Sequence, residues 1–288
     1  MTAKLPARIG CVPAPVLFLT GAGAMYLGAS LAVGLFQVVS PAAVAWLRLL
    51  GAAVVLLVWR RPGREAWWGR RLWLAGAFGL VTAVMNVAFY EAIARLPLGT
   101  AVAVEFCGPV AVAALGSRGV RDWLALLAAA SGVLLVSDAR WAGAQAGMLW
   151  ALGAALAWAG YILLAKRVAL GGNGVDDMAV GFGVAAVLLA PLGAGSGPVW
   201  GEVRLLALAV GVGVLSSVVP YALDQVVLRR IGRARFSVLL ALLPVTAAGV
   251  GLLVLHQVPG PLECAGIAAV VAAVVLRSDA GDEPVPAT

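Results

Sequence analysis

The sequence predicts an all-α polytopic membrane protein, with ten transmembrane helices arranged as two inverted repeats of five. Composition is the first reason: 63% of the residues are hydrophobic, 11% are charged and the mean hydropathy is +1.03, whereas about a quarter of the residues in a soluble domain are charged. The other two reasons are the spacing of the apolar runs and the alternation of basic residues between the loops that connect them.

Ten apolar runs lie between charges, glycines and prolines, and a membrane-spanning helix needs about 20 such residues. The first run is too long for the core of a signal peptide, so we expect it to be a retained span. Residues 1–13 are expected to form a cytoplasmic lead and residues 278–288, which are acidic and contain proline, a disordered cytoplasmic tail. The expected spans are 14–36, 41–59, 72–94, 97–116 and 122–137 in a first repeat (14–137), and 145–165, 177–193, 204–227, 236–255 and 260–276 in a second (145–277).

The net charge of +7 follows the loops rather than forming one basic patch. With the N-terminus inside, the inside segments contain sixteen Lys and Arg residues, and the outside loops contain only Arg95, Arg140 and Arg204. The positive-inside rule therefore places both termini in the cytoplasm. We expect the chain to interact with a lipid bilayer and not with nucleic acid.

Several kinds of site are not indicated. Cys11, Cys107 and Cys264 have no CxxC spacing, and the single histidine, His256, has no companion ligands, so no metal site is expected. The motifs of nucleotide-binding loops, zinc proteases and serine hydrolases do not occur, so neither a cofactor nor an enzymatic activity is expected. Pairs of small residues are expected to let helices pack closely in lipid: Gly28/Ala32, Gly79/Ala83 and Gly153/Ala157.

An internal repeat relates two segments of the chain. Residues 89–109 align with residues 224–244 at a constant offset of 135, and each segment contains a helix end, a short basic connection and a span interrupted by proline. Five spans in each half is an odd number, so the second half must enter the membrane with the opposite orientation. Interrupted spans at matching positions of inverted repeats point to a transport site near the middle of the membrane.

The prolines define where helical hydrogen bonding is expected to break. Pro109 has no N–H group, so the carbonyl of Glu105 loses its helical partner. Pro244 has the same effect on Leu240, and Pro220 is a further expected break. A charge and a free carbonyl thus coincide at Glu105.

Glu105 is the leading candidate for a functional residue. A carboxylate at this depth costs roughly 2.5 to 3.5 kcal/mol, and intramembrane acids usually handle ions or substrates. It can accept the ammonium group of a zwitterionic cargo and, because it can be protonated, can also couple transport to protons. The alternative is a structural acid paired with Arg48, the only basic residue inside a span. Arg48 is in turn a candidate partner for a cargo carboxylate, or its long side chain extends to the membrane surface.

Other polar and aromatic residues are candidates for the wall of a cargo cavity. Asn86 and Tyr90 share one helical face, as do Ser217 and Tyr221, while Trp158 and Tyr161 are three residues apart. Ordinary core packing is the alternative for all six. Asp224, near the cytoplasmic end of its span, is either half of a gate or an anchor at the interface. Glu91 and Arg95 are expected to form a surface ion pair.

The segment from Tyr90 to Pro109 resembles the EamA-type repeat of the drug/metabolite transporter superfamily. It is most similar to that of bacterial threonine/homoserine exporters, whose Pro-Leu-Gly and Ala-Val-x-x-Glu-Phe-x-Gly-Pro patterns match 97–99 and 103–109, with a slightly different spacing of the Ala-Val pair. Two departures are Asp224 in place of Glu and His256-Gln257 in place of the usual Gly-Glu. Further matches are Gly28-Ala29-Ser30-Leu31-Ala32, Leu47-Arg48-Leu49, Met85-Asn86, Trp158-Ala159-x-Tyr161-Ile162-Leu163 and Pro220-Tyr221-x-Leu223.

The resemblance implies a ten-helix inner-membrane exporter of small amino acids that is driven by the proton gradient. An exporter of drugs or other metabolites on the same fold is the alternative. The charged residues Arg48 and Glu105 favour a small zwitterion, because a drug exporter is expected to have a larger, aromatic and apolar cavity. An intramembrane enzyme lacks its motifs here, and a passive scaffold does not require paired broken helices.

Overall fold

The computed structural model describes residues 12–115, 119–138, 145–169, 174–220 and 239–278, together with residues 223, 226, 227 and 230. All regular secondary structure in these ranges is helical, which confirms the predicted class. Up to residue 138 the elements are α1 (Ala14–Leu35), α2 (Pro41–Arg60), the 3₁₀ helix η2 (Arg64–Trp67), α3 (Gly69–Ile93), α4 (Leu98–Glu105), α5 (Cys107–Leu115) and α6 (Val120–Asp138). They are followed by α7 (Gln145–Ala169), α8 (Gly174–Leu188), the 3₁₀ helix η3 (Ala190–Ser196), α9 (Gly197–Gly201), α10 (Val203–Gly213), the π-helix η4 (Val214–Val218), α12 (Leu242–Leu255) and α13 (Pro261–Ser278).

Each expected span contains an apolar helix, but the helices differ in length. Four of those described are long and apolar enough to cross a membrane: α1, α2, α3 and residues 145–164 of α7. A fifth candidate is bent by 65° where α8 meets the helical segment 190–201. The remaining expected spans contain shorter apolar helices: Leu98–Val112, Trp123–Val136, Val203–Ser217, Leu242–Leu255 and Pro261–Leu276.

Local sequence explains several helix ends. Ser40 accepts a hydrogen bond from the backbone N–H of Ala43 at 3.3 Å, and Pro41 occupies the first helical position, so α2 begins there. The same helix ends at Arg61, which has a left-handed backbone with φ of 45°. His256 ends α12 in the same way, with φ of 54°.

Two helices are interrupted at matching positions of the sequence repeat. The fourth expected span is divided at Phe106, between α4 and α5. In the ninth, a turn at Ala241 separates residues 239–240 from α12. Ala241 follows Phe106 by 135 residues, the offset that aligns the two sequence segments.

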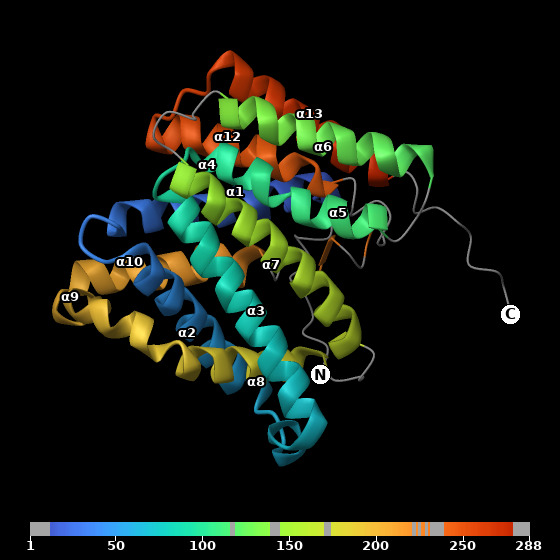
Figure 1. Cartoon of the computed structure of the whole chain (residues 1–288). Coiled ribbons are helices and arrows are strands. Elements are labelled where there is room, and N and C mark those ends of the chain that lie inside the picture. Colours follow the sequence, from blue (N-terminus) through green and yellow to red (C-terminus); the bar gives the residue numbers. More distant parts are fainter. Residues whose placement is uncertain are drawn as a thin grey trace, which may run out of the picture.

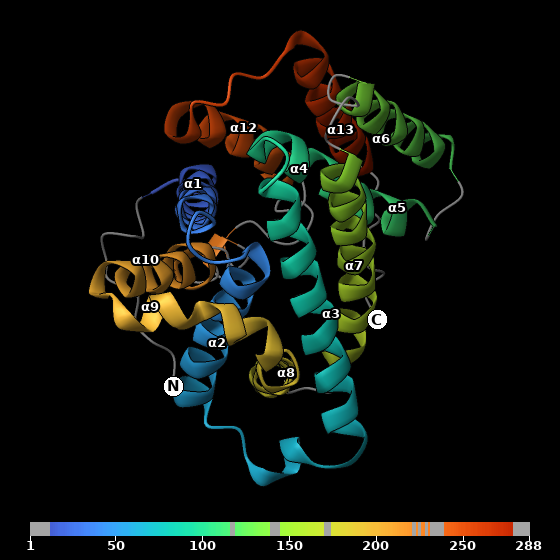
Figure 2. The same cartoon turned by 60° about the vertical axis from the view of Figure 1, so that its left-hand side comes forward.

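The helix contacts also recur in matching pairs. Helix α3 packs along α7, and these two lie side by side through the middle of the molecule, whereas α6 packs along α13 at one side (Figures 1 and 2). The contact of α3 with α7 has a counterpart in that of α10 with α1, and the contact of α3 with α8 has one in that of α10 with α2. Helix α4 contacts α7, as α12 contacts α1.

Glycines allow the closest helix approaches. A Cβ on Gly79 would collide with the backbone of Gly181, so α3 and α8 meet backbone to backbone, as the small pair Gly79/Ala83 predicts. Gly28 is similarly tight against Ser216. A Cβ on Gly153 would lie 4.0 Å from the Ala88 side chain, at ordinary contact distance, so the packing of α7 on α3 does not require a glycine there. Gly108 makes a close approach to Ala155 that the sequence pairs do not include.

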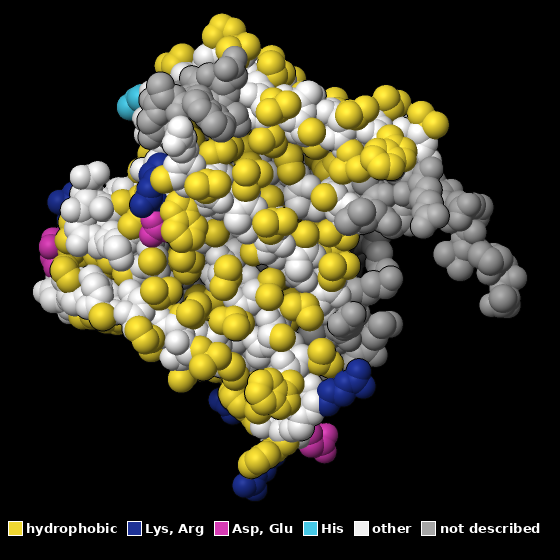
Figure 3. Space-filling view, viewed as in Figure 1, with side chains coloured by type: hydrophobic (Ala, Val, Ile, Leu, Met, Phe, Trp, Pro, Cys, Tyr) yellow, Lys and Arg dark blue, Asp and Glu magenta, His cyan; other side chains and the backbone are white. Residues whose placement is uncertain are grey.

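The outer surface is apolar over its middle. Figure 3 shows hydrophobic side chains across the centre of one face, with charged side chains toward its lower and upper-left ends. Large side chains among those exposed include Trp73, Leu156 and Leu253, with 80%, 76% and 77% of their surface accessible. An exposed apolar surface of this kind is unfavourable in water and favourable in lipid.

Candidate functional site

Arg48 is held in the interior by the π-helix η4. Its Nε donates to Ser217 Oγ at 3.2 Å, and its Nη2 donates to the backbone carbonyl of Ser216 at 3.0 Å. A guanidinium has five N–H groups, and within the described chain Nη1 makes no hydrogen bond. Arg48 is therefore fixed on one side and has free donors on another.

Close packing of α1 positions the serine that holds Arg48. Ser216 Oγ donates to the backbone carbonyl of Met25 at 3.3 Å. Ser216 can approach this closely because Gly28 has no side chain, and a Cβ there would collide with the serine hydroxyl. The π-helical turn, a local distortion that is frequent at functional sites, thus aims one carbonyl at Arg48 and one hydroxyl at α1.

Tyr90 on α3 lies beside Arg48. The Arg48 Cζ atom is 5.8 Å from the centre of the Tyr90 ring, within the range of a cation–π interaction. The ring is fully buried and meets Phe36 edge to face at 6.0 Å. Among the described residues, the Tyr90 hydroxyl is the only buried side-chain oxygen or nitrogen that lacks a hydrogen-bond partner.

Glu105 ends α4 at the interruption of the span. It is 9% exposed, and its side chain makes no hydrogen bond or ion pair with any residue in the described ranges. The Glu105 side chain interacts electrostatically with Arg48, and also with Tyr26 of α1. Arg48 and Glu105 are thus within electrostatic range of one another without forming a direct salt bridge.

The other expected site residues are distributed unevenly around this centre. Trp158 packs edge to face against Phe106, the residue after Glu105, with ring centres 4.8 Å apart. Tyr161 packs instead against Phe78 at 5.0 Å. Asn86 donates from Nδ2 to the carbonyl of Thr82 in its own helix at 2.9 Å.

The expected helix-breaking prolines lie close to the distorted segments. Pro109 is in the first turn of α5, Pro220 follows η4 by two residues, and Pro244 is in the first turn of α12. Tyr221 and Asp224 lie outside the described residues, as do residues 1–11 and 279–288, which include most of the expected lead and tail.

Two residues near Glu105 and Arg48 were not predicted. Tyr26 is 3% exposed on α1, and Ser216 is 3% exposed in η4. Ser217 was selected by its four-residue spacing from Tyr221, whereas the signal available for these two residues was an isolated hydroxyl in an apolar span. It was too general to distinguish these residues from hydroxyls bonded to their own helix, such as that of Ser30, which donates to the Tyr26 carbonyl at 2.9 Å.

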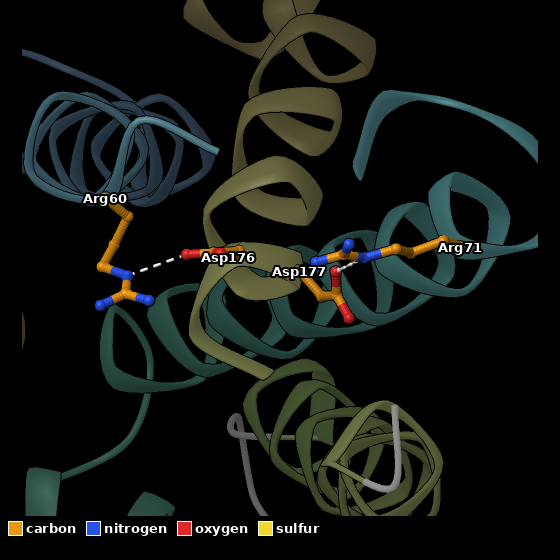
Figure 4. Close-up of polar contacts among 4 residues, drawn as sticks. All are labelled: Arg60, Arg71, Asp176 and Asp177. Carbon is orange, nitrogen blue, oxygen red and sulfur yellow. Dashed lines mark hydrogen bonds and ion pairs between the residues drawn. The ribbon is translucent and has the colours of Figure 1, made fainter. Parts of the chain in front are cut away.

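At one end of the molecule, two ion pairs join α2 and α3 to α8. Arg60 Nε contacts Asp176 Oδ1 at 2.8 Å, and Arg71 Nε contacts Asp177 Oδ1 (Figure 4). The Asp177 side chain is 7% exposed and that of Asp176 is 20% exposed. Both acids occupy the first turn of α8, where the helix dipole also favours negative charge.

Buried hydrogen bonds join the first residues of α4 to the start of α13 and to Gln257, which precedes α13. Thr100 Oγ1 donates to Glu263 Oε1 at 2.9 Å, and these residues are 1% and 2% exposed. The other oxygen of Glu263 accepts from the backbone N–H of Gly260 at 2.9 Å, and Gln257 Oε1 accepts from the N–H of Leu98 at 2.9 Å. Glu263 was not predicted, whereas the predicted ion pair between Glu91 and Arg95 is confirmed.

An apolar groove of about 670 Å³ lies between α12 and α13. Its lining includes Val245, Ile267 and Val271, and it contains neither Arg48 nor Glu105. The groove therefore has the chemistry of a lipid-facing surface and not that of a site for a charged molecule.

Arg48, Glu105 and Tyr90, together called the polar centre, have groups for three chemical functions. Arg48 offers free N–H donors to an anion, Glu105 offers oxygen acceptors to a cation, and the Tyr90 hydroxyl offers a donor and an acceptor. Charge interactions are strong in such an apolar environment. The set is complementary to a small molecule that carries an ammonium group, a carboxylate and a further polar group.

Comparison with known proteins gives relatives over nearly the whole chain. Residues 145–278 match the EamA-like transporter family. The chain is 32% identical to the threonine/homoserine exporter RhtA of Salmonella typhimurium, over 94% of this chain and 92% of the relative, and 31% identical to RhtA of Escherichia coli K12, over 90% and 88%. A solved crystal structure covers 91% of this chain and 96% of its own, with a TM-score of 0.57 and 20% identity, which shows a shared fold.

Proposed function

This chain belongs to the EamA-like transporter family and is a multi-pass membrane protein rather than an enzyme, and we propose that it is a proton-coupled exporter of small amino acids such as threonine and homoserine. The observation that carries the proposal is the position of Arg48, which lies beside Tyr90 and within electrostatic range of Glu105. All three side chains have polar atoms that no described residue satisfies. The Tyr90 hydroxyl is fully buried, and an unsatisfied buried polar group is uncommon in native proteins and calls for an explanation. A hydroxylated amino acid would satisfy all three.

The proposed architecture is ten membrane spans, arranged as inverted repeats of residues 14–137 and 145–277. Support comes from the interruptions at Phe106 and Ala241, which are 135 residues apart, and from the helix contacts that recur in matching pairs. In this arrangement Glu105 and Arg48 belong to the first repeat, and the serines that hold Arg48 belong to the second. The polar centre is thus completed only where the two repeats meet.

Alternating access in this proposal is a rocking of the two repeats about the polar centre. The ion pairs of Asp176 and Asp177 join the repeats at the end that the positive-inside rule assigns to the cytoplasm. The Thr100–Glu263 bond joins them at the opposite end. Each end must open while the other stays closed, and protonation of Glu105 releases the cargo ammonium on the outer side.

The test uses bacterial cells that lack their own exporters and carry the wild type or Glu105→Gln. Efflux of preloaded threonine and homoserine is followed with and without a protonophore. Glu105→Gln is expected to abolish proton-coupled efflux, because an amide neither pairs with an ammonium as a charge nor carries a proton. Glu91→Gln is the matched control, since Glu91 is paired with Arg95 away from the polar centre, and its efflux is expected to equal that of wild type.

Membrane levels of every variant are measured by immunoblot. Wild-type efflux in a well-inserted Glu105→Gln variant would contradict the role of Glu105. The absence of amino-acid efflux from well-inserted wild type would instead favour an exporter of drugs or other metabolites on the same fold.

A further inference from the structure

The Tyr90 hydroxyl differs from the hydroxyls that bind to their own helices. Thr82, Ser30 and Thr246 each donate to a carbonyl of their own helix at 2.8 to 2.9 Å. The Tyr90 side chain is too long to form such a bond, and its oxygen has no partner in the described structure. A buried hydroxyl without a hydrogen bond destabilises the folded protein, so its presence needs a reason other than stability.

The position of Tyr90 suggests that reason. Its ring lies against the guanidinium of Arg48, at 5.8 Å from Cζ, and the Nη1 donors of that guanidinium are also without a described partner. A phenylalanine would fill the same space and could make the same contacts with Arg48 and with Phe36. Only the oxygen distinguishes Tyr90 from Phe, and no described residue forms a hydrogen bond with this oxygen.

We propose that the Tyr90 hydroxyl binds the side-chain hydroxyl of the cargo and makes the exporter selective for hydroxylated amino acids. This inference rests on the proposed function, since it assigns a residue to the choice among amino acids. With the cargo carboxylate at Arg48 and its ammonium group at Glu105, the side chain of a small amino acid is the part left to contact Tyr90. A site that hydrogen-bonds a substrate hydroxyl discriminates strongly against an analogue that lacks it.

One analogue isolates the contribution of the cargo hydroxyl. Threonine and homoserine differ only in the carbon that carries the hydroxyl, and removal of this oxygen from either gives 2-aminobutyrate. The full-length wild type and Tyr90→Phe are reconstituted into liposomes, and initial rates for the three amino acids give kcat/KM for each. Tyr90→Phe is expected to lower kcat/KM about three- to tenfold for threonine and homoserine, and to leave that for 2-aminobutyrate unchanged.

A second readout separates binding from a structural role. The thermal midpoint of cargo-free Tyr90→Phe in detergent is expected to equal or exceed that of wild type, because the substitution removes a polar atom that has no partner. Equal losses for all three amino acids, or no loss for any, would overturn the inference while leaving the exporter intact. Failure of the wild type to transport any of the three would overturn the proposed function, and this inference with it.

Discussion

The hydrogen bond between Thr100 and Glu263 allows a quantitative test of how the two proposed repeats are held together. The bond is 2.9 Å long, and its partners are 1% and 2% exposed, so water does not compete for either group. Hydrogen bonds to charged groups contribute about 1.5–3 kcal/mol, whereas interhelical bonds in membrane proteins average about 0.6 and reach about 1.7 kcal/mol. Full burial and a carboxyl acceptor place this bond near the upper membrane value, at about 1.5 kcal/mol.

Thr100→Val removes the hydroxyl and preserves the shape of the side chain. The free energy of unfolding is measured for purified protein in mixed micelles by titration with a denaturing detergent, followed by tryptophan fluorescence. We expect a loss of about 1.5 kcal/mol for Thr100→Val. The double variant with Glu263→Met should reveal a coupling energy between the two sites, because methionine has no oxygen acceptor and the same bond is removed by either change.

Thr82→Val is the matched control for this substitution. Thr82 is also buried, at 5% exposure, but its hydroxyl donates at 2.8 Å to the Phe78 carbonyl of its own helix. Loss of this local bond is expected to cost about 0.5 kcal/mol or less. Equal effects of Thr82→Val and Thr100→Val, or additive effects of Thr100→Val and Glu263→Met, would refute the reasoning that this bond holds the proposed repeats together.

Two further predictions concern the α8 interface. Asp177→Asn is expected to lower the free energy of unfolding by about 1–2 kcal/mol in the same assay, because it leaves the charge of a partly buried arginine unpaired. Asp176→Asn, at the more exposed ion pair, should lower it by less than about 1 kcal/mol. Equal losses for the two variants would contradict this order. Gly79→Ala is expected to reduce the yield of folded protein measured by size-exclusion chromatography, since its Cβ would collide with Gly181, while Gly51→Ala, with nothing within 4 Å of its Cβ, should fold as wild type does. A normal yield of Gly79→Ala would show that α3 and α8 can separate without loss.

The sequence was sufficient for the helical class and for the location of the apolar helices. Hydrophobic runs specify where a chain can be helical in lipid, because every backbone group must be satisfied within the helix. The bends in these helices could not be predicted from the hydrophobic runs. The 65° bend after Leu188 follows an apolar stretch that periodicity treats as continuous, and Pro191 lies inside the helical turn that begins at Ala190 rather than marking the end of the run.

The candidate site was predicted in part because charges in apolar runs stand out. Arg48, Glu105 and Ser217 were selected from the sequence, and the structure places Arg48 on Ser217 and near Glu105. The contact with Ser216 depends on a π-helical turn, which has no pattern in a single sequence. It also depends on the absence of a side chain at Gly28, where the small pair Gly28/Ala32 predicted close packing but not the residue that packs there. Tyr161 was selected by its spacing from Trp158, but tertiary packing directs it to Phe78 instead.

Glu263 illustrates a different obstacle. At the third position of a helix that starts with Pro261, it has the pattern of a residue that caps its own helix, and one of its oxygens does bind the N–H of Gly260. Its second oxygen reaches α4, which is distant in sequence, and only the fold brings the two together. A residue whose sequence pattern already indicates a local capping role can therefore have a second, long-range contact that the pattern does not reveal.

The contacts that join the proposed repeats are weak enough to be broken in turn. A half-exposed ion pair such as Arg60–Asp176 contributes about 1 kcal/mol or less, and the buried bond at Thr100 about 1.5 kcal/mol. The energy released when cargo satisfies Arg48, Glu105 and Tyr90 is of a similar size for each hydrogen bond formed. Filling the polar centre can therefore shift the balance between the two ends, which one strong salt bridge at either end would prevent.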